Sequence, residues 1–141
     1  MPPYKIPKRV KHRKEFRRAR DRKATKGNYV AFGDYGLQAL DGCWLKSNCI
    51  EAGRIACQHY LKREGKLFIR VFPDKPVSKK PLETRMGKGK ADVDYWAARV
   101  RAGTVLYELA GVSETRAREA FFRVAMKMPM RCRMIGRRVE A

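Results

Sequence analysis

The chain has 141 residues, of which 44% are hydrophobic, so it is long enough to bury the core of one domain. Thirty-four lysines and arginines against fourteen acidic residues give a formal net charge of +20, and a compact protein with this balance repels itself unless it binds a polyanion. No apolar run approaches the roughly 18–20 residues that a membrane-spanning helix needs, which favours nucleic acid over a membrane as the partner.

Residues 1–27 are predicted to form a basic arm outside the core, because they carry twelve basic and two acidic residues and few apolar ones. No apolar stretch follows the basic N-terminus, so we expect no secretory signal, and the lack of serine disfavours an organellar transit peptide. Tyr4, His12 and Phe16 are side chains of the kind that stack on unpaired bases. Arginine, which predominates in the second half of the arm, binds phosphate bidentately.

Residues 28–141 are predicted to form one α+β domain, because apolar residues recur there with strand and helix periods. Blocks 28–72 and 91–126 are nearly balanced in charge, so the excess positive charge lies outside them. The predicted elements, in chain order, are a strand over Tyr29–Leu37, a helix over Ser47–Glu64, strands over Lys66–Phe72, Tyr95–Arg101 and Thr104–Ala110, a helix from Ser113 to Lys127 and a strand over Arg131–Arg137. This order favours two helices packed on a mostly antiparallel sheet.

Both predicted helices carry signals at their ends and one apolar face. Ser47 or Asn48 is expected to cap the first helix, with Gly65 in the left-handed position after it. Ser113 is expected to cap the second helix, and Pro129 to end it. The residues expected to face the core are Ile50, Gly53, Cys57, Tyr60 and Leu61 of the first helix and Ala117, Ala120, Phe121, Val124 and Met128 of the second.

A long basic segment, residues 73–94, is predicted to be an extended loop of the core domain, and a basic tail ends the chain. Within the loop, Arg85–Lys90 alternates cations with glycines, which let backbone amides approach a phosphate closely. The spacing GxxxxGKS/T of a nucleotide-binding P-loop is absent. We therefore expect the arm, the loop and the tail to bind the phosphates of a nucleic acid, with release of counterions.

Nothing in the sequence predicts catalysis or a bound cofactor. No Ser–His–Asp, Cys–His or paired-carboxylate arrangement stands out, so we expect no enzyme, no cofactor and no small-molecule substrate. Asp92 and Asp94 are interpreted as solvated turn residues rather than a metal pair. The cysteines lack CxxC spacing and are expected to be reduced, free thiols rather than zinc ligands; they are Cys43, Cys49, Cys57 and Cys132.

Five segments occur in one collinear order over nearly the whole chain. They are PKRVKHRKEFR (Pro7–Arg17), FGDYGLQAL (Phe32–Leu40), GKLFIRVFPDKPVSKKP (Gly65–Pro81), ETRMGKGK (Glu83–Lys90) and LYELAGVSETRAREAF (Leu106–Phe121). Together they resemble the family of large-subunit ribosomal protein number sixteen, in its bacterial and organellar branch. The chain departs from that family at Ala91, where a third glycine is common, and in the first helix, where Gly53 and Cys57 interrupt a stretch of Ala and Arg.

The resemblance implies a structural constituent of the large ribosomal subunit, located on ribosomes in the cytoplasm, with an organellar ribosome left open as the alternative. It implies large-subunit rRNA, tRNA and neighbouring large-subunit proteins as partners, with contacts to A-site and P-site tRNA near the peptidyl-transferase region and a role in late subunit assembly and translation. The resemblance places the tRNA-proximal loop on Arg85, Met86, Gly87, Lys88, Gly89 and Lys90. The arm residues expected to bind rRNA are Lys8, Arg9, Lys11, Arg13, Lys14, Arg17, Arg18, Arg20, Arg22 and Lys23.

Two other classes of protein stay open on the sequence alone. The first is a free-standing basic nucleoid or chromatin protein, which binds DNA as well as RNA through the same charges. The second is an RNA-modifying enzyme, which needs a cofactor loop or a catalytic dyad that the sequence does not show.

Overall fold

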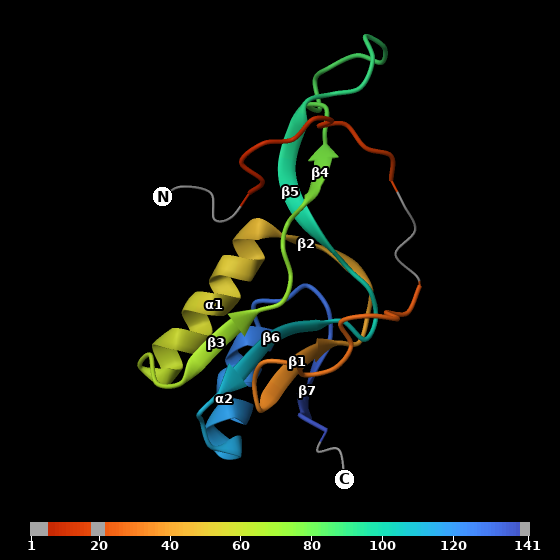
Figure 1. Ribbon diagram of the computed structural model, residues 1–141. Helices are drawn as coiled ribbons and strands as arrows, with labels where there is room; N and C mark the ends of the chain where they lie inside the picture. The colour runs from red at the N-terminus through yellow and green to blue at the C-terminus, as the bar shows by residue number, and fades with distance from the viewer. Residues whose placement is uncertain (1–5, 18–21, 139–141) are drawn as a thin grey trace.

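The computed structural model describes residues 6–17 and 22–138. Its helices and strands are, in chain order, β1 (Tyr35–Ala39), β2 (Cys43–Lys46), α1 (Ser47–Leu61), β3 (Lys66–Ile69), β4 (Lys75–Ser78), β5 (Val93–Val100), β6 (Val105–Ala110), α2 (Glu114–Ala125) and β7 (Cys132–Gly136) (Figure 1). The predicted α+β class is confirmed, since the structure combines two helices with strands in antiparallel sheets.

The strands form two antiparallel sheets. The first has the strand order β3-β6-β1-β7 and the second the order β2-β5-β4. A turn at Gly103 joins β5 to β6, but these two strands lie in different sheets rather than side by side. The second sheet, with the loop beyond it, projects away from the helical end of the molecule (Figure 1).

Helices α1 and α2 pack on one another and on the inner face of the four-stranded sheet. The buried face of α1 matches the prediction except at Tyr60, which is half-buried. In α2 the buried residues are Ala117, Ala120, Phe121 and Val124, as the helical period predicts. Met128 lies beyond the end of α2 and still packs against the core. Burial of these faces is the main source of stability for both helices.

The predicted start of α1 at Ser47 is confirmed, but its predicted side-chain cap and its predicted end at Glu64 are wrong. Its N-cap is Lys46, and Ser47 is a buried first residue of the helix whose side chain does not cap it. The left-handed turn that ends α1 begins at Lys62, with φ of 51°, three residues before Gly65. Gly65 has the predicted left-handed backbone, with φ of 73°, but it lies in the turn after α1, where a Cβ would be 2.7 Å from the carbonyl oxygen of Ala110. Close approach of two backbones therefore explains this glycine better than helix capping does.

The predicted strand over Tyr29–Leu37 is wrong in its first half, because residues 28–33 leave the sheet and lie over its outer face. We call residues 28–33 the covering segment. A Cβ on Gly33 would lie 2.5 Å from the carbonyl oxygen of Leu109, so only glycine permits this close approach. A Cβ on Gly36 would likewise lie 2.8 Å from Cγ2 of Val30.

Glu108, at the centre of β6, holds the covering segment in place. Its side chain is fully buried and forms an ion pair with Arg70. Its two oxygens accept hydrogen bonds from the backbone amides of Ala31 (3.2 Å), Phe32 (2.6 Å) and Gly33 (2.9 Å). A carboxylate that accepts several backbone N–H groups and one arginine is fully satisfied, which is the condition for burying its charge.

We expect this carboxylate to make the stability of the protein depend on pH. Burial by itself raises the pKa of Glu108, but the three backbone amides and Arg70 outweigh burial and hold the pKa below its ordinary value of 4.5. A lowered pKa contributes stability that is present above the pKa of the unfolded chain and is lost as pH falls through the pKa of the folded one. Urea unfolding from neutral pH down to about pH 3 measures this loss. An equally steep decline in a Glu108→Gln variant would show that other groups cause it.

Candidate nucleic-acid interface

The described start of the arm, residues 6–17, crosses the base of the long loop, beside β4 and β5 (Figure 1). Lys75 of β4 donates a hydrogen bond from Nζ to the carbonyl oxygen of Phe16 (3.0 Å). The Glu15 carboxylate lies 3.7 Å from Lys75 Nζ and 3.8 Å from an Arg99 nitrogen. Two cations of the second sheet therefore hold the one described carboxylate of the arm.

Lys75 is unusual because its side chain is only 2% exposed. Burying an ammonium group is costly unless it is paired. Here its Nζ lies near Glu15 and bonds to the Phe16 carbonyl, and it lies 5.0 Å from the centroid of the Trp44 ring. Among the described residues, its polar partners all belong to the arm, so the site on β4 is built to receive that segment.

A second set of contacts joins the arm to the far end of the loop. Lys14 Nζ donates to the backbone oxygen of Lys90 (2.9 Å) and lies 4.0 Å from Asp92. In return, Lys90 Nζ donates to the backbone oxygen of Glu15 and lies 5.8 Å from the Phe16 ring centroid. Lys14 and Lys90 were both predicted to contact nucleic acid, and both also fasten the arm to the loop.

The tip of the loop is fully exposed from Pro81 to Lys90. Gly87, Lys88 and Gly89 take left-handed backbone angles in succession, with φ of 108°, 56° and 76°. Lys80 Nζ donates to the Gly87 carbonyl oxygen (2.5 Å) and closes the turn. A Cβ on either glycine would meet nothing within 4 Å, so the glycines serve backbone conformation and leave the amides open to a ligand.

The predicted arm residues fall into three groups. Those exposed in residues 6–17 are Lys8, Arg9, Lys11, Arg13, Lys14 and Arg17, and those exposed after the gap are Arg22 and Lys23. Arg18 and Arg20 lie outside the described residues. After the gap the chain lies beside the β5–β6 turn, where the amide of Ala24 bonds to the carbonyl oxygen of Ala102 (2.8 Å).

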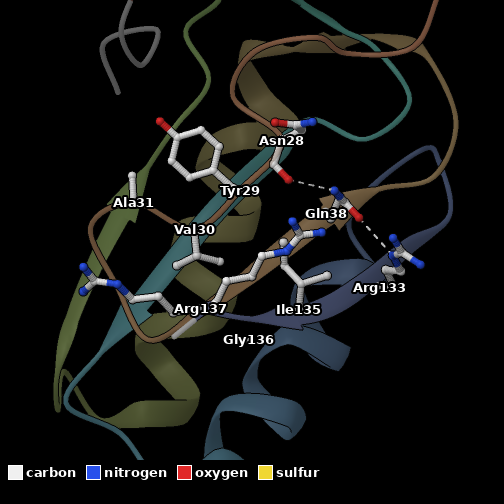
Figure 2. Close-up of a pocket in the computed structure, with 10 residues that line it drawn as sticks. Asn28, Tyr29, Val30, Ala31, Gln38, Arg133, Ile135, Gly136 and Arg137 are labelled. Carbon is white, nitrogen blue, oxygen red and sulfur yellow. Dashed lines mark hydrogen bonds between the residues drawn. The ribbon is translucent and has the colours of Figure 1, made fainter. Parts of the chain in front are cut away.

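Sequence reasoning missed a basic groove of about 870 Å³ on the outer face of the four-stranded sheet (Figure 2). The covering segment forms one wall and β7 with the following residues forms the other. Its lining residues are Asn28, Tyr29, Val30, Ala31, Gln38, Arg133, Ile135, Gly136, Arg137 and Arg138. The signal was present in the sequence, because alternate residues of a strand share one face and so place Arg133 and Arg137 together.

The cysteines form no disulfide. Burial raises the pKa of the Cys57 thiol to about 12 and that of Cys132 to about 11, so both stay protonated at neutral pH. Within residues 6–17 and 22–138, no cluster of three or more potential metal-ligating side chains occurs. No helix in the same ranges is long and apolar enough to cross a membrane.

Comparison with known proteins assigns this architecture to a family. The family model described as ribosomal protein L16p/L10e matches residues 7–135. The chain is 58% identical over 133 residues to the large ribosomal subunit protein uL16 of Rhodopirellula baltica, which covers 94% of this chain and 96% of that protein. It is 50% identical over 132 residues to the uL16 of Agathobacter rectalis, covering 94% of this chain and 91% of that protein.

The family match and both relatives identify this fold, a nearly neutral α+β core with exposed basic extensions, as that of a structural protein of the large ribosomal subunit. Proteins of this class are not enzymes. The chain belongs to the ribosomal protein L16p/L10e family. This confirms the resemblance found in the sequence and the expected ribosome-bound location in the cytoplasm, and it removes the nucleoid protein and the RNA-modifying enzyme as alternatives.

Proposed function

We propose that the chain binds large-subunit rRNA through the basic arm and contacts tRNA in the A and P sites through the loop tip, near the peptidyl-transferase region. In this role it supports late subunit assembly and translation, together with neighbouring large-subunit proteins. The arm residues Lys8, Arg9, Lys11, Arg13 and Arg17 neutralise phosphates, and the folded core supplies the fit to RNA shape.

The observation that carries this proposal is the fastening of the arm to the base of the loop. Glu15 and the Phe16 carbonyl meet Lys75, and Lys14 meets the backbone of Lys90. The two cationic segments therefore form one continuous surface, which lies on the second sheet and away from the helices (Figure 1). Phosphate contacts along the arm then set the position at which the loop tip is presented.

The exposed apolar side chains of the loop agree with this role. Leu82 and Met86 are almost completely exposed and contact no core residue. Leu82 and Met86 give the same loop tip apolar surface that a partner can cover. Ribose and base faces of RNA offer such apolar surface beside the phosphates.

Ribosomes that carry Arg85→Ala and Lys88→Ala together are expected to assemble normally but to accommodate tRNA more slowly. Loss of charge-assisted contacts worth about 1.5–3 kcal/mol in sum slows accommodation about tenfold or more. Both residues are exposed and neither is ion-paired within the described residues, so the fold is not at risk. Rapid-mixing measurement of peptide transfer on purified subunits gives the rate.

The matched control is the double variant Arg116→Ala and Arg118→Ala, which removes the same charge from α2. These arginines pair with Glu64 and Glu114 at the other end of the molecule. We expect the control to leave the rate of peptide transfer unchanged. Equal rates for the loop variant and the unsubstituted protein would refute the assignment of the loop to tRNA.

A further inference from the structure

We propose that the groove between the covering segment and β7 captures one unpaired nucleotide of RNA, with its phosphate between Arg133 and Arg137 and its base against Tyr29. The inference rests on the proposed function, because it assumes that the polyanion is RNA. It goes further in naming a site that lies neither on the arm nor on the loop.

The register of β1 and β7 builds the floor of the groove. Gln38 pairs with Arg133, and Gly36 pairs with Ile135, so these four residues share the outer face of the sheet. The Val30 side chain covers Gly36, since a Cβ at Gly36 would lie 2.8 Å from Cγ2 of Val30 and 3.5 Å from Cγ1 of Ile135. The floor is therefore apolar and shallow, and an arginine flanks it on either side, since Arg137 follows Ile135 by two residues (Figure 2).

Gln38 fixes the position of Arg133. The glutamine is only 7% exposed, and its Nε2 donates to the carbonyl oxygens of Asn28 (3.1 Å) and Gly103 (2.8 Å). These two acceptors orient the amide so that Oε1 accepts a hydrogen bond from Arg133 Nε (2.9 Å). No described residue accepts a hydrogen bond from the terminal nitrogens of Arg133, which can therefore bind another acceptor. A guanidinium that is already oriented loses little entropy when it binds a phosphate.

The charge of the groove is not balanced by any carboxylate of the described residues. Arg133, Arg137 and Arg138 line it, and no carboxylate pairs with any of them within residues 6–17 and 22–138. Nearby Arg131 differs, because both its Nε and a terminal nitrogen bond to Asp41. Arginines that line one groove without carboxylate partners repel one another until an anion binds there. A phosphate, which accepts bidentate bonds from arginine, is the anion that suits them.

Tyr29 supplies the surface for a base. Its side chain is 60% exposed on the covering segment, and its ring points away from Ile135, with Val30 between them (Figure 2). The groove volume of about 870 Å³ falls within the roughly 300–1,000 Å³ of small-ligand sites, so it admits one base with its sugar. A base reaches such a site only from a single-stranded loop or bulge, because bases in a duplex are stacked and paired.

The test compares binding of a short, labelled single-stranded RNA to the full chain and to two double variants. Arg133→Gln with Arg137→Gln removes the proposed phosphate contacts, and Arg116→Gln with Arg118→Gln removes the same charge from α2. For the first variant, we expect binding several-fold weaker and a plot of log K against log salt whose slope is lower by about 1.4. A larger loss of RNA affinity in the Arg133 and Arg137 variant than in the α2 variant supports the groove as the binding site. Equal losses of affinity in the two variants overturn it.

The Arg133 variant also removes a hydrogen bond to Gln38, so a second pair of variants tests the groove without touching that bond. Tyr29→Leu removes the aromatic ring from an exposed position, and Tyr29→Phe keeps it. We expect Tyr29→Leu to bind the RNA about tenfold more weakly and Tyr29→Phe to bind it normally. Equal affinities of the two Tyr29 variants would overturn the stacking of a base at this site.

Two further experiments identify the source of the ligand. A free nucleoside monophosphate should compete poorly, because one nucleotide lacks the other contacts of the chain, and competition as strong as that of RNA would overturn RNA as the ligand. Ultraviolet crosslinking in purified large subunits should join a nucleotide to the peptide with Tyr29, and its absence there would overturn the site. Should the chain be missing from large subunits altogether, the proposed function fails, whereas the binding experiment still decides on the groove.

Discussion

A Glu108→Gln variant is expected to unfold with a free energy lower by about 3–5 kcal/mol than that of the unsubstituted protein, because a buried ion pair is broken. Glutamine turns an NH₂ group toward backbone amides of the covering segment that themselves donate. It also leaves Arg70 without its charge partner. Urea unfolding at neutral pH measures the difference.

The control for this prediction is Glu114→Gln, which removes a carboxylate that is exposed and pairs with Arg118 on the surface of α2. Exposed pairs contribute little, so we expect a loss of at most about 0.5 kcal/mol. Should Glu108→Gln cost no more than this control, the covering segment is not held by the carboxylate. The covering segment would then not be fixed as one wall of the groove.

A Lys75→Met variant is expected to release the arm while leaving the core folded. Methionine fills much of the buried space near Trp44 but cannot bond to the Phe16 carbonyl or pair with Glu15. The lost charge-assisted contacts, about 1.5–3 kcal/mol, correspond to a tenfold or larger rise in the fraction of detached arm. Limited trypsin digestion should then cut after residues 13, 14 and 17 about tenfold faster.

The control here is Lys79→Met, which removes a charge from an exposed residue close by in the chain. We expect Lys79→Met to be cut at the rate of the unsubstituted protein. Urea unfolding of Lys75→Met should remain a single cooperative transition, because the core cluster includes no residue of the arm. Unchanged digestion of Lys75→Met would mean that the contacts at β4 do not hold the arm.

Local patterns in the sequence were sufficient for the elements that bury one clear face. The helical period identified α1 and α2 with four of five core residues of α1, because burial follows side-chain spacing directly. The strands β5, β6 and β7 were placed within one or two residues for the same reason. Charge distribution identified the loop and the arm as segments outside the periodic core.

The strands β2 and β4 were missed for physical reasons. Each has four residues, too few for a period to appear, and Pro76 argued against a strand in β4. Pro76 is tolerated because β4 lies at the edge of its sheet. The division of the strands into two sheets could not be predicted from the sequence either, because it depends on which distant strands pair and not on a local signal.

The candidate site was predicted only in part. Exposed cations at Arg85 and Lys88 follow from composition, but the burial of Lys75 does not, since nothing in KPVS shows that a lysine faces the arm. The groove at Arg133 and Arg137 depends on the covering segment, whose place on the outer face is fixed by Glu108 in a distant strand. Contacts between residues about 75 positions apart leave no periodic trace in a single sequence.

The central claim is that the arm and the loop form the RNA-contacting surface of this chain. The most direct test is chemical modification of lysines, followed by mass spectrometry, in the free protein and in purified large subunits that contain it. Lys8, Lys11, Lys79 and Lys88 are exposed in the free chain and should react readily there. We predict that all four become strongly protected in the subunit. Equal reactivity of these lysines in both states would contradict the claim.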